Sequence, residues 1–264
     1  MASFTAKDVQ ALRRLTGAGM LDAKKALEAT DGDTEAARQW LRERGLAGAA
    51  KRADREASQG AVALAVTERA AAIVELRCET DFVAKAETFV NLTDELAQLV
   101  AGRGADAVAE RTDAIDELKT TLQENISVGQ VVRFDIGPDS VVGTYLHMQS
   151  GRGVNAVLVE MRNGTEELAH DIAVHIAFAR PAYLRRDDVP KDEVEAERAT
   201  VEKISRNEGK PEAALEKIVQ GRMNGWFKER VLLEQAYARD EKRTIADVVQ
   251  DAEIVRFAQV VVGG

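Results

Sequence analysis

The stretch AIVELRCETDFVAK, residues 72–85, carries the strongest structural signal in the chain. Its first half is apolar and β-branched and predicts a buried strand, and residues 79–81 predict a polar turn. Phe82 stands at the tip of this turn, before a segment with apolar residues at helical spacing: Phe89, Leu92, Leu96 and Leu99. Phe82 either folds back onto the core or is presented, beside Asp81, as a wedge to a partner.

The strand and helix around this stretch occur twice. Residues 72–77 resemble residues 157–162, 85 positions later, and each segment follows another strand-like run, residues 61–66 or 141–146. Each segment is also followed by an amphipathic helix, the second of which carries Leu168, Ile172 and Ile176. A repeat of this kind predicts two similar structural units.

The connection between strand and helix differs between the two copies. When Phe89 is aligned with Leu168, the first copy is six residues longer, and the extra residues lie within Thr80 to Lys85. A core shared by both copies does not require such an insertion. The insertion therefore favours the wedge interpretation of Phe82 over the core interpretation.

These patterns predict an α+β fold whose core is two duplicated strand-strand-helix units with antiparallel sheets. The first half of the core spans residues 61–140, with a helix near 114–122 and a further strand from Ile126 to Ile136. The second half spans residues 141–180 and 226–264, with a helix near 245–249 and a closing strand at 254–258.

Residues 1–48 predict three helices. The first carries Val9, Leu12 and Leu15 on one face, and the second carries Ala23, Ala26 and Leu27. Asp33 can cap a third helix that runs through Ala37, Trp40 and Leu41 to Gly45. Met20 follows a glycine-rich loop, and its adaptable side chain either joins the core or faces outward.

Two further segments complete the predicted domain organisation. Residues 49–60 are small, charged and aperiodic, which is typical of a linker. Residues 181–225 contain two polar segments with thin apolar stripes, the first through Val201 and Ile204, joined by a turn at 207–211. We predict an inserted antiparallel helical hairpin, which is either a solvated structural element or a projecting arm.

Composition limits the class of protein. The chain has 264 residues, of which 45% are hydrophobic and 31% charged, as in soluble globular proteins. It has neither an apolar run of the ~18 residues that span a membrane nor a leader-like N-terminus. A single cysteine fits a reducing compartment, so we predict a cytoplasmic protein. The formal net charge of −9 disfavours nucleic acid as a ligand and favours a protein partner.

The sequence offers little for catalysis. The histidines are His147, His170 and His175, and the last two diverge around a helix, so they make poor joint metal ligands. Cys78 lies in a strand pattern, which favours a small core residue, although a thiol enzyme remains the alternative. Residues 151–153 are better explained by a hairpin turn than by a phosphate loop. We predict no enzyme activity, cofactor or metal.

Two long motifs resemble those of a known family. Residues 12–27, LRRLTGAGMLDAKKAL, and residues 75–85, ELRCETDFVAK, are similar to the two signatures of the bacterial elongation factor Ts family in order and spacing. The similarity continues through residues 124–126, 143–147 and 216–223 and so covers nearly the whole chain.

The resemblance implies a guanine nucleotide exchange factor that binds elongation factor Tu, in its GDP-bound and nucleotide-free forms, and promotes GDP release by destabilising the magnesium and phosphate site. It implies an N-terminal ubiquitin-associated-like docking domain and a coiled-coil insertion that meets the partner or a second copy, as in a two-to-two complex. The resemblance implies three sets of partner-binding residues. The exchange wedge consists of Thr80, Asp81, Phe82 and Val83, and the N-terminal docking set consists of Leu12, Gly19, Met20 and Lys24. The support pair is Ile126 and His147. The alternative is a protein-protein adaptor without exchange activity.

Overall fold

The computed structural model of the protein describes residues 4–16, 18, 20–52 and 54–264. It combines helices with antiparallel strands, which confirms the predicted α+β class. Contacts divide the chain into two compact units, one of residues 1–135, 146–156 and 260–264, the other of residues 136–145 and 157–259. None of the helices in the described part of the chain combines the length and hydrophobicity of a membrane span.

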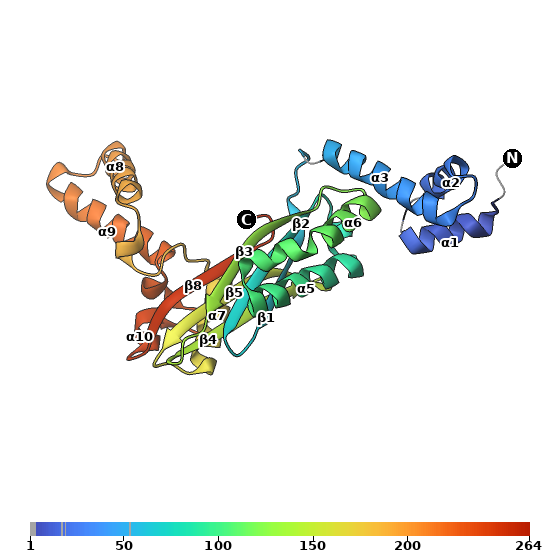
Figure 1. Cartoon of the computed structure of the whole chain (residues 1–264). Coiled ribbons are helices and arrows are strands. Elements are labelled where there is room, and N and C mark those ends of the chain that lie inside the picture. The colour runs from blue at the N-terminus through green and yellow to red at the C-terminus, as the bar shows by residue number, and fades with distance from the viewer. Residues whose placement is uncertain (1–3, 17, 19, 53) are drawn as a thin grey trace. The chain divides into compact units, whose positions relative to one another are not determined.

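The first three helices are α1 (Ala6–Thr16), α2 (Met20–Ala29) and α3 (Thr34–Arg52), shown in blue in Figure 1. Asp33 caps α3, because its Oδ1 accepts hydrogen bonds of 2.9 Å from the backbone N–H groups of Glu35 and Ala36. The three helices share one apolar core: Val9, Leu12, Ala18, Ala23, Ala26, Leu27, Ala37 and Leu41.

Two expectations for these helices are wrong. Leu15 is 59% exposed, because successive residues turn by about 100° and Leu15 lies about 120° around α1 from Val9, at the edge of the apolar stripe. The third helix continues through Gly45 to Arg52. A glycine costs only about 1 kcal/mol inside a helix, and the alanines, leucine and basic residues that follow are strong helix formers.

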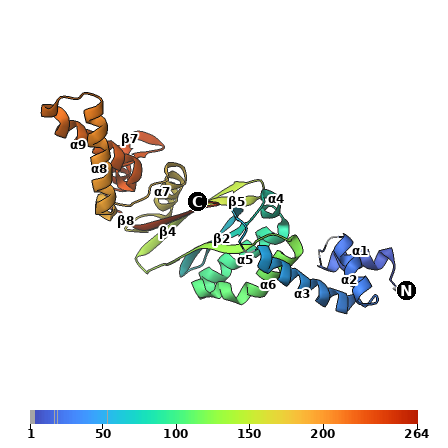
Figure 2. The same cartoon turned by 90° about the horizontal axis from the view of Figure 1, so that it is seen from above.

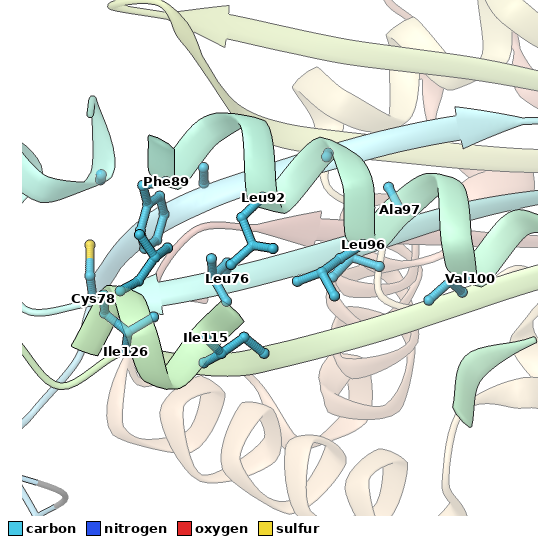
Figure 3. Close-up of a cluster of buried hydrophobic side chains, with 14 of the residues drawn as sticks. Leu76, Cys78, Phe89, Leu92, Leu96, Ala97, Val100, Ile115 and Ile126 are labelled. Atoms are coloured by element: carbon cyan, nitrogen blue, oxygen red, sulfur yellow. The ribbon is translucent and has the colours of Figure 1, made fainter. Parts of the chain in front are cut away.

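The first sheet contains β1 (Gln59–Val66), β2 (Ala70–Cys78) and β3 (Ser127–Asp135) in the order β1-β2-β3, with both pairs antiparallel. Helix α5 (Glu87–Arg103) packs on β1 and β2, and the 3₁₀ helix η1 (Ala105–Arg111) and α6 (Thr112–Leu122) pack on α5. Figure 3 shows the resulting core, which is lined by Leu76, Cys78, Phe89, Leu92, Leu96, Val100, Ile115 and Ile126. Leu99 is only partly buried, and Val100 takes its expected place in the apolar stripe.

The second sheet contains β4 (Ser140–Gln149), β5 (Arg152–Arg162) and β8 (Glu253–Val261) in the order β4-β5-β8. Ser150 and Gly151 between β4 and β5 both have positive φ, so the hairpin turn prediction for this segment is confirmed. Helix α7 (Glu166–Ala179), η3 (Leu232–Glu234) and α10 (Ile245–Val249) supply the core of the second unit with strand residues such as Val159 and Met161. A short hairpin, β6 (Ala236–Tyr237) with β7 (Asp240–Thr244), was not predicted, because so few residues carry no periodic signal.

The second unit also contains the helices α8 (Lys191–Asn207) and α9 (Glu212–Arg230), which follow the 3₁₀ helix η2 (Arg186–Asp188) and pack against each other (Figure 2). Gly209 turns the chain between them with a φ of +71°. Their shared apolar residues include Val201, Leu215, Val219 and Met223. Ile204 was expected inside but is exposed, and Ser205 is buried instead. Helix α9 continues past residue 225 because no helix breaker follows, so Trp226 and Phe227 belong to its last turns.

Candidate functional site

A single helical turn, α4 (Asp81–Ala84), stands between β2 and α5. Thr80 caps it, because its Oγ1 accepts a hydrogen bond of 3.3 Å from the backbone N–H of Val83. Val83 and Ala84 are buried, whereas Phe82 is 85% exposed. The core interpretation of Phe82 is therefore wrong, since one side of α4 anchors in the core and the other presents an aromatic ring to solvent.

A negative charge lies beside the exposed ring. The Asp81 carboxylate pairs with the Lys85 ammonium at 2.5 Å, one helical turn away, and both side chains are exposed. The hydrogen bond from Lys85, followed by its charge, lowers the pKa of Asp81 below its ordinary value. The carboxylate is therefore ionised at neutral pH, and α4 presents an apolar and an anionic group together.

A distant segment holds this turn. Glu124, which lies between α6 and β3, accepts hydrogen bonds of 3.0 Å from the backbone N–H groups of Glu79 and Thr80 and one of 2.5 Å from the Thr80 hydroxyl. In return, the Glu79 carboxylate accepts a bond of 2.7 Å from the Asn125 N–H. Neither carboxylate is a predicted site residue, although Glu79 lies in the 75–85 motif and Glu124 in the similar segment 124–126.

The predicted support residues lie in different environments. Ile126 is fully buried in the core beneath the turn (Figure 3), so it can hold the Glu124 segment but cannot itself contact a partner. His147 is exposed on β4, next to Met148, which is 54% exposed.

Arg152, at the start of β5, donates a hydrogen bond of 2.7 Å to the Gly60 carbonyl, and its charge contributes to the lowered pKa of Asp81.

The N-terminal docking residues also divide by exposure. Met20 is 50% exposed, so the outward alternative for its side chain is the correct one, and Lys24 is exposed in an ion pair of 3.6 Å with Glu28. Leu12 is fully buried and supports the surface from below, as Val83 does in α4. Gly19 lies outside the described residues. The structure adds Leu15 and Leu21, which are 59% and 71% exposed; an apolar residue at helical spacing predicts burial, so the sequence pattern does not mark them as surface groups.

The thiol alternative lacks chemical support. Cys78 is fully buried, and burial raises the pKa of its thiol to about 12, so the nucleophilic thiolate is not populated at neutral pH. Within the described part of the chain, no group of histidine, cysteine, aspartate or glutamate side chains is arranged to hold a metal ion. The features that stand out are instead exposed apolar side chains, which are typical of a surface that binds another protein.

Comparison with known proteins shows the family of this chain. Residues 79–264 match the family model described as elongation factor TS. Full-length relatives named elongation factor Ts include those of Clavibacter michiganensis subsp. michiganensis, 46% identical with both chains fully covered, and Acidothermus cellulolyticus, 44% identical over all of this chain and 99% of the relative. The relative from Streptomyces griseus subsp. griseus is 44% identical, again with both chains fully covered. The chain belongs to the elongation factor Ts family and is thus an elongation factor of protein biosynthesis.

Proposed function

We propose that the protein is the guanine nucleotide exchange factor of elongation factor Tu: it binds the GDP-bound GTPase, promotes GDP release and remains bound to the nucleotide-free form. The observation that carries the proposal is the exposed Phe82 ring on a turn that is held by the buried Val83 and Ala84 and by the hydrogen bond from Thr80 to Glu124. Burial of an exposed apolar side chain against a partner contributes favourably to the free energy of binding.

The mechanism follows from linkage between the two binding equilibria. If the factor binds the empty GTPase more tightly than the GDP-loaded one, GDP must be weakened by the same factor, about 1.4 kcal/mol for each tenfold. Phe82 would be buried only in an opened partner. The ionised Asp81 would enter where magnesium and phosphate are held, and its charge would disfavour the bound phosphate. The protein performs no chemical reaction in this scheme and needs no cofactor or metal of its own.

The proposal assigns separate roles to the parts of the chain. Thr80 and Val83 shape the wedge, Ile126 and His147 support it, and the N-terminal ubiquitin-associated-like domain docks through the surface around Met20 and Lys24. Leu12 and Gly19 belong to this docking domain, and Leu15 and Leu21 extend its exposed apolar surface. The proposed boundaries are docking domain 1–48, linker 49–60, core halves 61–140 and 141–180 with 226–264, and helical hairpin 181–225. Helix α3 extends from the docking domain into the linker as far as Arg52, and α9 extends from the hairpin into the core half as far as Arg230.

The remaining partner assignments belong to the same proposal. The helical hairpin contacts the GTPase or a second copy of the chain, which would form a two-to-two complex. Neither nucleic acid nor a membrane surface is a proposed ligand, since the net charge is −9, and the site of action is the cytoplasm, where translation occurs.

The test measures release of a fluorescent GDP analogue from elongation factor Tu. We expect wild type to accelerate release many-fold and Phe82→Ala to keep binding but to lose about 10- to 100-fold of the acceleration, because burial of a phenylalanine is worth about 1.5–3 kcal/mol. Phe178→Ala is the matched control, since Phe178 is 81% exposed on α7, and it should behave as wild type. If wild type binds without accelerating release, the adaptor is favoured. If wild type and Phe82→Ala accelerate release equally, the assignment of Phe82 to the exchange site is wrong.

A further inference from the structure

The turn that carries Phe82 is too short to hold its own conformation. Helix α4 has four residues, and its cap is one hydrogen bond from Val83 to Thr80. Isolated helices of this length are not stable in water, because nucleation fixes several dihedral angles for a single hydrogen bond. The direction in which Phe82 points must therefore be fixed by tertiary contacts, namely burial of Val83 and Ala84 in the core and the bonds that hold the residues before α4.

Glu124 provides such a constraint. Its Oε2 accepts from the backbone N–H groups of Glu79 and Thr80, and its Oε1 accepts from the Thr80 hydroxyl. All three bonds end on the two residues directly before α4, so one carboxylate fixes both the backbone and the capping side chain. Hydrogen bonds to an ionised acceptor are roughly twice as strong as neutral ones.

The Glu124 segment is itself firmly held. The fully buried Ile126 anchors it in the core, and Asn125 is tied on two sides. The Asn125 N–H donates to the Glu79 carboxylate at 2.7 Å, and its side-chain amide donates to the Arg55 carbonyl at 2.7 Å. The two segments thus exchange hydrogen bonds in both directions, and the constraint on Thr80 is transmitted from the core.

We propose that Glu124 is a positioning residue for nucleotide exchange, which fixes the exit of β2 so that Phe82 is held ready to enter the GTPase. The inference rests on the proposed exchange function and deepens it. Glu124 acts through Thr80 and α4 and does not itself enter the partner. Loss of its carboxylate leaves Phe82 present but no longer preorganised, so part of the binding free energy is lost to ordering the turn.

The experiment compares GDP release at saturating concentrations of wild-type, Glu124→Ala and Glu124→Gln factor in the full-length chain. Glu124→Ala should lower the maximal rate about tenfold, with a smaller change in the concentration that gives half the maximal rate. Glu124→Gln should stay within about threefold of wild type, because its amide oxygen can still accept both backbone bonds and its amide nitrogen can donate to Thr80. Glu95→Ala, which removes a carboxylate paired with Arg111 at 2.7 Å elsewhere in the unit, should leave the rate unchanged.

A double-mutant cycle separates positioning from a general loss of stability. If Glu124 acts through Phe82, the Phe82→Ala, Glu124→Ala double variant should release GDP as Phe82→Ala alone does. Additive losses, or a rate loss that matches a loss of folded protein in thermal unfolding, would overturn the inference while leaving the exchange function intact. A wild-type rate in Glu124→Ala would also overturn it. A wild-type factor that fails to accelerate release would overturn the exchange function and this inference together.

Discussion

The two copies of the repeated unit use the same device to start a helix and differ in the helix they start. Thr80 and Thr165 each accept a hydrogen bond from the backbone N–H three residues later, at 3.3 Å and 3.1 Å. In the second copy, the capped helix is α7, which has 14 residues and packs on its sheet. In the first copy, the capped helix is the four-residue α4, and the packing helix α5 begins only afterwards.

The two strand-to-helix connections differ in whether they only join the strand to its helix or also present side chains to solvent. The second connection is closed tightly through Asn163, with a φ of +53°, and Gly164, and this is sufficient to join a strand to its helix. The first connection is longer than the core needs and presents Phe82 to solvent, with Glu124 holding its base. The repeated core supplies stability, and the extra residues in one copy supply the exposed surface.

The strongest test makes the first connection like the second. Replacement of Cys78–Ala86 by Asn-Gly-Thr, the residues at 163–165, should lower stimulated GDP release by at least about a hundredfold, equivalent to about 2.7 kcal/mol, because the wedge is gone. The chain should still fold, as judged by far-ultraviolet circular dichroism, since the second copy closes the same connection. Its melting temperature should fall because Cys78, Val83 and Ala84 leave the core. Retained exchange would mean that the extra residues do not distinguish the copies.

The next test concerns a buried glutamate that both copies carry. Glu75 on β2 pairs with Arg77 at 2.9 Å and also accepts from the backbone N–H groups of Gln130 at 3.0 Å and Gly263 at 3.4 Å, whereas Glu160 on β5 pairs with Arg256 at 2.6 Å. Glu75→Ala should destabilise by about 2–3 kcal/mol, because it leaves two partly buried backbone N–H groups without their acceptor.

Glu160→Ala should cost less, about 1 kcal/mol, since the nearly half-exposed Arg256 side chain can turn to water. Urea unfolding of both variants measures the difference. An equal loss in the two variants would show that the backbone bonds to Glu75 contribute little. A larger loss in Glu160→Ala would reverse the ranking of the two copies.

The smallest expected effect is a pH dependence confined to the second copy. His175 is buried on α7 at the position that aligns with the buried Leu96 on α5. Its Nε2–H donates to the Gln235 side chain at 3.0 Å, and its Nδ1 accepts from the Ala238 N–H at 3.2 Å. Burial lowers the pKa of His175, so below about pH 6.5 the unfolded chain binds a proton that the folded chain does not.

Stability should therefore fall as the pH decreases from 7.5 to 5.5, with a slope smaller in His175→Leu than in wild type. The melting temperature across this range measures the slope. His170→Gln is the control, because His170 is exposed, and it should keep the wild-type slope. If His175→Leu and wild type show the same slope, the buried imidazole is not the source of the pH dependence.

Prediction from the sequence worked where the pattern was long and local. Apolar residues that recur at fixed periods predict four strands and two helices correctly. The strands lie at 61–66, 72–77, 141–146 and 157–162, and the helices begin near Phe89 and Leu168. The pattern predicts burial wrongly for Leu15 and Ile204, which stand at helical spacing with buried residues but are 59% and 44% exposed. The β6–β7 hairpin escaped because two and five residues are too few to show a period.

The sequence alone determined the class of fold, the repeat, the extra residues before α5 and the family, because each is written in consecutive residues or in their spacing. The tertiary structure alone decided that Phe82 and Met20 face solvent, that Leu12, Val83 and Ile126 do not, and that Glu124 holds Thr80. Exposure depends on which distant segments cover a side chain, and a hydrogen bond between residues 44 positions apart depends on how the chain folds back. Neither is encoded in any local period.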